Sequence, residues 1–104
     1  MDIKNYLIEN GITPNLRGFR YLIEAVNFCI DHFNHKKEYP AVVNVIYPAV
    51  AELFNTTPSK VERGIRYIIE LLPRSLFNGR RLTNSGVIFY FAYLNSENKR
   101  RKKC

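Results

Sequence analysis

The stretch YPAVAELFNTTPSKVERGIRYIIELL, residues 47–72, carries the clearest structural pattern in this chain of 104 residues. It predicts a short helix over 48–54, a turn over 55–57 and a longer helix over 58–72. A short helix, a tight turn and a longer second helix are typical of a helix-turn-helix, whose second helix can enter the major groove of DNA. The rest of the chain is expected to be organised around this motif.

The start of the second helix has two possible positions. Thr57 suits an N-cap, because its hydroxyl can accept a bond from an unpaired amide of the first turn. Pro58 would then take the first helical position, where its missing amide costs nothing. Ser59 and Glu62 also fit a capping box, which would begin the helix two residues later.

The helix predicted over 58–72 has two different faces. The apolar positions recur at helical spacing and predict a buried stripe, formed by Val61, Ile65, Ile68, Ile69 and Leu72. On the opposite face Arg63, Arg66 and Glu70 project together. Arginine can bond both acceptors of a guanine edge, and glutamate can accept from cytosine N4. The same face could instead be a solvated one with intrahelical ion pairs such as Glu62–Arg66.

The net charge of +7 is concentrated in the second half of the chain. Residues 1–57 hold five Lys and Arg against six Asp and Glu, a balance of −1, whereas residues 58–104 hold eleven against three, a balance of +8. The positive charge therefore begins at the candidate recognition helix, as an electrostatic footprint for phosphates does. RNA or an anionic membrane surface could use the same charge, so its sign alone does not choose the partner.

Composition argues against several classes of protein. Hydrophobic residues make up 46% of the chain, enough for a core, and two cysteines do not form a disulfide framework. We expect no signal peptide and no membrane span, which fits a reduced, cytoplasmic setting. No catalytic motif or phosphate loop is recognisable, and His32 with His35 lack the further ligands that a metal needs. We therefore predict no enzyme activity, no cofactor and no metal site.

Two further helices are predicted before the motif, over 2–10 and 16–35. The longer one has a continuous apolar stripe and is expected to form the central scaffold. The segment AVVNVI (41–46) is left open between a strand, which its β-branched residues favour, and a helical turn.

The C-terminal part predicts one more helix and a basic tail. GVIFYFAYL (86–94) has strand propensity, but the cap signal TNS (83–85) before it favours a helix over about 84–95. The run KRRKK (99–103) predicts a tail that is disordered when free. It could be an arm that follows phosphates or simply a solvated terminus.

Three segments carry a further signal: GITPNLRGFRYLIEAV (11–26), VIYPAVAELFNTTPSKVERGIRYIIE (45–70) and LTNSGVIFYFAYL (82–94). Together they resemble the C-terminal DNA-binding effector domain of the sporulation master response regulator of endospore-forming bacteria. The resemblance implies an all-α fold, a compact bundle of about five to six helices that contains the helix-turn-helix. Members of that family usually carry a receiver domain, for which this chain has no room, and a longer segment in place of residues 73–81. A stand-alone effector domain is therefore expected.

The resemblance also implies which residues contact DNA. Glu62 and Arg63 match the family's recognition motif and are the first candidates for base contacts, and Arg66 is the third. The candidates for contacts with the DNA backbone or with flanking bases are Thr57, Ser59, Lys60, Tyr67, Arg74, Arg80 and Arg81.

The sequence thus predicts one domain over 1–98 and a basic tail over 99–104. We expect sequence-specific binding to duplex DNA and transcription regulation related to sporulation, in the bacterial cytoplasm at the nucleoid. Tandem or dimeric binding on adjacent boxes is expected, as are contacts with RNA polymerase or a related regulator. Two other functions stay open: a protein-interaction module that modulates another regulator, and RNA binding through the basic half.

Overall fold

The computed structural model describes the backbone of residues 2–103 and the side chains of residues 2–95. Within this part of the chain every regular element is helical, which confirms the all-α prediction. The elements are α1 (Ile3–Glu9), α2 (Arg17–Lys36), the π-helix η1 (Val42–Ile46), α3 (Tyr47–Leu53), α4 (Pro58–Leu71), the 3₁₀ helix η2 (Arg74–Phe77) and α5 (Asn84–Lys103).

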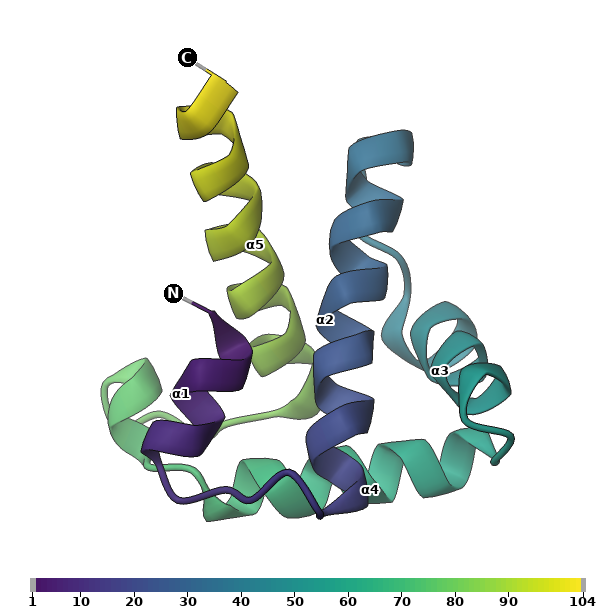
Figure 1. Ribbon diagram of the computed structural model, residues 1–104, viewed down its shortest axis with the longest axis vertical. Coiled ribbons are helices and arrows are strands. Elements are labelled where there is room, and N and C mark those ends of the chain that lie inside the picture. The colour runs from purple at the N-terminus through teal and green to yellow at the C-terminus, as the bar shows by residue number, and fades with distance from the viewer. Residues whose placement is uncertain (1, 104) are drawn as a thin grey trace.

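The arrangement is organised around α2 and α4. Figure 1 shows α4 crossing the N-terminal end of α2, while α5 runs beside α2 and α3 lies on the other side. The two ends of α4 therefore meet different neighbours, and its middle lies against α2. This crossing leaves the side of α4 that points away from α2 uncovered.

The ends of the helices follow local signals in the sequence. Asp2 caps α1 by accepting a hydrogen bond of 3.2 Å from the amide of Lys4, and Gly11 follows α1 with a φ of +82°. Lys37 takes the left-handed conformation at the end of α2. Asp2 satisfies an amide at the start of α1, whereas Gly11 and Lys37 turn the chain after the last residues of α1 and α2.

The segment at 41–46 is a π-helical turn that leads into α3, so the helical interpretation is confirmed. Val42 and Ile46 are buried, and their contacts with the core do not need a strand conformation. The described backbone contains no strand with which this segment could pair. Its β propensity is therefore overridden by its packing.

The last helix is confirmed as well, although it is longer than expected. Thr83 accepts a hydrogen bond of 3.0 Å from the amide of Gly86, which caps the start of α5. The helix was expected to end near Asn95, but its backbone continues to Lys103. Side chains beyond Asn95 lie outside the described residues, so the division into a domain and a disordered basic tail stays a prediction.

The crossing of α2 and α4 depends on two glycines. A Cβ atom added at Gly18 would overlap the carbonyl oxygen of Gly64 and would lie 2.7 Å from Cγ1 of Ile68. A Cβ added at Gly64 would lie 2.9 Å from Cδ2 of Tyr21. The two backbones therefore approach each other with no space for a side chain between them.

We predict that Gly18→Ala destabilises the protein by about 1–3 kcal/mol, because the new methyl group meets backbone atoms that cannot move aside. Urea denaturation measures this change. Asn27→Ala, at an exposed position of α2, is the matched control and should change the free energy of unfolding by less than about 0.5 kcal/mol. A Gly18→Ala protein as stable as the wild type would show that the helices can separate freely at this point.

Candidate nucleic-acid interface

The helix-turn-helix has the geometry that the sequence predicts. Thr57 accepts a hydrogen bond of 3.3 Å from the amide of Lys60, and α4 begins at Pro58. Asn55 adopts a left-handed φ of +53°, and the amide of Thr56 donates to the carbonyl of Ala51 at 2.9 Å. Thr57 is thus the N-cap, and the later start at the capping box of Ser59 is not used.

The two faces of α4 separate as predicted. All five residues of its apolar stripe are buried: Val61, Ile65, Ile68, Ile69 and Leu72. On the opposite side the polar side chains are exposed: Ser59, Lys60, Arg63, Arg66, Tyr67 and Glu70. The buried stripe fixes the rotation of α4 about its own axis, so the basic face is held outward.

Glu62 and Arg66 form the intrahelical ion pair that the sequence allowed. The Nε atom of Arg66 donates to Oε2 of Glu62 at 2.9 Å, and its Nη2 contacts Oε1 of the same carboxylate. The hydrogen bond with Glu62 raises the pKa of the Arg66 guanidinium. The Arg66 side chain is 55% exposed and that of Glu62 is 31% exposed, so the pair still reaches the solvent. An exposed pair of this kind orients its members more than it stabilises the fold.

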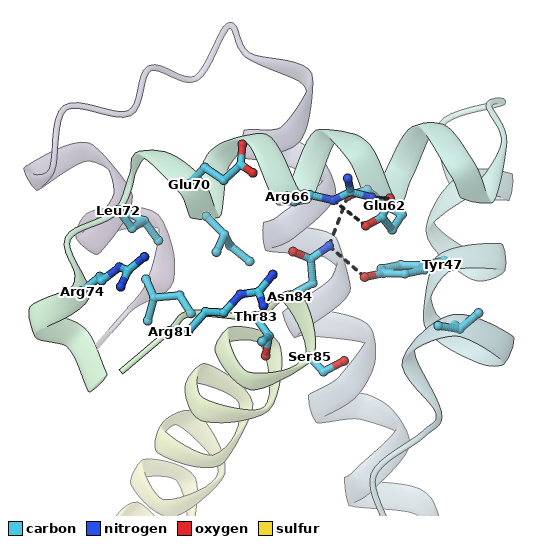
Figure 2. Close-up of a pocket in the computed structure, with 13 residues that line it drawn as sticks. Tyr47, Glu62, Arg66, Glu70, Leu72, Arg74, Arg81, Thr83, Asn84 and Ser85 are labelled. Atoms are coloured by element: carbon cyan, nitrogen blue, oxygen red, sulfur yellow. Dashed lines mark hydrogen bonds and ion pairs between the residues drawn. The ribbon is translucent and has the colours of Figure 1, made fainter. Parts of the chain in front are cut away.

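A hollow of about 780 Å³ lies along one flank of α4, where the segment after η2 meets the start of α5 (Figure 2). Arg66, Arg74 and Arg81 line it together with the carboxylates of Glu62 and Glu70. The structure therefore brings two of the predicted backbone-contact residues, Arg74 and Arg81, to the same flank as Arg66. Arg80 is exposed next to Arg81 but does not line this hollow.

Asn84 is the residue of this region that the sequence did not single out. Its Nδ2 donates to the hydroxyl of Tyr47 at 3.0 Å and to the backbone carbonyl of Glu62 at 3.1 Å (Figure 2). Burial raises the pKa of the Tyr47 phenol, and the hydrogen bond from Asn84 partly offsets that rise. The sequence pattern placed Asn84 in the cap signal at 83–85, within which Thr83 accepts the capping hydrogen bond. The presence of Asn84 in this capping segment is the only signal that the sequence offered for this contact.

The described residues also bear on metal binding and on insertion into a membrane. Among residues 2–95 no three His, Cys, Asp or Glu side chains converge on a point that could hold a metal ion. The ring of His32 lies 6.1 Å from that of Phe28, and the Nδ1 atom of His35 lies 2.8 Å from the carbonyl oxygen of Asp31. In the described part of the chain, no helix is both long and apolar enough to span a bilayer.

A helical domain in which a capped helix-turn-helix presents a rigid basic face belongs to the class of helix-turn-helix regulatory domains. The family model described as "Sporulation initiation factor Spo0A C terminal" matches residues 3–99, and the chain belongs to this family. This match confirms the resemblance found in the sequence. The family is one of DNA-binding regulatory domains in sporulation, not of enzymes.

We predict that Thr57→Ala destabilises the protein by about 1 kcal/mol, because the amide of Lys60 loses its acceptor at the start of α4. Chemical denaturation followed by circular dichroism measures the loss. Ser59→Ala is the control, since Thr57 already caps the helix, and it should change stability by less than about 0.5 kcal/mol. Equal losses in the two variants would mean that α4 has no single N-cap in solution.

Proposed function

We propose that this protein binds duplex DNA sequence-specifically through α4 and acts as a transcription regulator related to sporulation. The observation that carries this proposal is the outward basic face of α4, which sits on a fully buried apolar stripe. A helix fixed in this way can hold its side chains against base edges without first becoming ordered, which lowers the entropic cost of binding.

Three residues are proposed to contact bases. Arg63 is exposed and has no ion-pair or hydrogen-bond partner among the described residues, so its donors are available for a guanine edge. Glu62 and Arg66 are joined to each other and would approach the groove as a unit. The remaining acceptor capacity of Glu62 and the remaining donors of Arg66 suit a cytosine and a guanine edge respectively.

The proposed backbone contacts lie on both sides of these residues. Ser59 and Lys60 are exposed in the first turn of α4, where backbone amides also favour an anion. Thr57 uses its hydroxyl oxygen as a cap and keeps its O–H as a donor. Tyr67 is 54% exposed and suits a phosphate or a flanking base. On the flank with the hollow, Arg74 and Arg81 suit phosphates of one strand, and Arg80 adds charge beside them.

We further propose that copies of this domain bind in tandem or as a dimer on adjacent boxes and contact RNA polymerase or a related regulator. Such a function places the protein at the nucleoid, in the cytoplasm. Two functions compete with this proposal. A protein-interaction module should bind duplex DNA weakly and without sequence preference. An RNA-binding protein should prefer structured RNA over duplex DNA.

Selection from a random duplex library, followed by titration of the selected sites against salt, tests the proposal. We predict enrichment of one short box, and we expect Arg63→Ala to weaken binding to it by about 1–3 kcal/mol and to relax preference at one base pair. Lys36→Ala is the control: it removes the same charge at the end of α2 that lies away from α4 in Figure 1. Equal weakening on every sequence would make Arg63 a phosphate contact, and no enrichment would favour the competing functions.

We predict that deletion of residues 99–104 makes the salt dependence of DNA binding shallower, because each lost phosphate contact reduces the slope of log K against log salt by about 0.9. Preference for the selected box should not change, because phosphate contacts carry no sequence information directly. A variant with serine at positions 99–103 keeps the length of the tail and separates charge from length. A slope equal to that of the full chain would show that the tail takes no part in binding.

A further inference from the structure

The hydrogen bonds of Asn84 connect three helices beneath the proposed base contacts. Asn84 is the first residue of α5, Tyr47 is the first residue of α3, and Glu62 lies in the second turn of α4. An amide side chain has two N–H donors, and here each has its own acceptor, the Tyr47 hydroxyl and the Glu62 carbonyl. Both bonds are partly buried, so water competes with them less than at an exposed site.

The location of these bonds distinguishes them from other contacts of α4. The buried stripe fixes the rotation of α4, and the glycine crossing fixes its distance from α2. The stripe reaches the flank that carries Glu62 and Arg66 through Ile69 and Leu72, which line the same hollow but lie at least seven residues after Glu62. On that flank the Asn84 amide is the contact that holds the backbone of α4 at Glu62, directly behind the Glu62–Arg66 pair (Figure 2).

We propose that Asn84 is a positioning residue for sequence recognition: by joining Tyr47 to the Glu62 carbonyl, it fixes the place of the Glu62–Arg66 pair in the DNA groove without contacting DNA itself. This inference rests on the proposed function of α4. A base contact needs more accurate alignment than a phosphate contact does. Base edges are read by directional hydrogen bonds, whereas basic side chains attract phosphates over a longer range. A small displacement of α4 at Glu62 therefore lowers discrimination between sequences more than it lowers affinity for DNA in general.

Two variants interrupt this connection, one in its middle at Asn84 and one at its Tyr47 end. Asn84→Ala removes both donors, and Tyr47→Phe removes one acceptor while keeping the shape of the buried ring. Neither variant changes the charge of the protein. Asn95→Ala is the matched control: its amide donates to the Phe91 carbonyl at 2.8 Å, a partly buried bond of the same kind within α5, away from α4.

The experiment measures the affinity of each variant for the selected box, for every single-base-pair variant of that box and for random duplex DNA. Preference at the base pairs that Glu62→Ala and Arg66→Ala identify should fall about 3- to 10-fold in Tyr47→Phe, the loss expected for one hydrogen bond, and at least as much in Asn84→Ala, which loses two. Affinity for random duplex should stay within about twofold, since it depends on charge. Asn95→Ala should retain the wild-type preference.

Each other outcome has a definite meaning. If both variants keep the wild-type preference, or lose affinity for all duplexes by the same factor, Asn84 has only a structural role and the inference is wrong. If Asn84→Ala does not fold, the isosteric Tyr47→Phe decides the question alone. If the wild-type protein enriches no box, the proposed function fails and the inference fails with it. If the wild type enriches a box and both variants keep the wild-type preference for it, only the inference is overturned.

Discussion

The close approach of Gly18 and Gly64 is the constraint on which the rest of the molecule depends. Because no side chain separates the two backbones, α4 lies directly against the N-terminal end of α2. The apolar stripe of α4 then reaches the core that α2 and α5 build, and no residue from 2 to 95 covers the opposite face. A larger residue at either glycine would lift α4 away from this core. The exposure of the basic face is thus a consequence of how α4 is packed, and not only of its composition.

The outward face itself contributes little to folding. Its one ion pair within the described residues, Glu62–Arg66, lies at the surface, where water screens it. Stability comes instead from apolar residues that are fully removed from water, such as Ile65, Ile68 and Phe91. This separation leaves the charged side chains available for the proposed DNA contacts, because the fold does not rely on their partners. The division between the two faces of α4 is therefore both a structural and a functional boundary.

Much of the fold could be predicted because its signals are local. The cap at Thr57, the left-handed turn at Asn55 and the stripe of α4 each depend on residues within a few positions of one another. The glycine crossing and the Asn84 contacts could not be predicted in this way. Tyr47 and Asn84 are 37 positions apart, and no periodicity relates them. Gly18 and Gly64 are 46 positions apart, and no local pattern in the sequence relates them. The helix at α5 was predicted against its own strand propensity through its cap.

The contact that Asn84 makes with α4 has a consequence for how this domain can change through evolution. Its acceptor on α4 is a main-chain carbonyl, and every amino acid supplies one. Replacement of the side chain at position 62 therefore leaves the anchor intact, as does replacement at its exposed neighbours on the same helix. Under the proposed function, operator preference can therefore change through substitutions at these exposed positions alone, while the packing that positions α4 is retained.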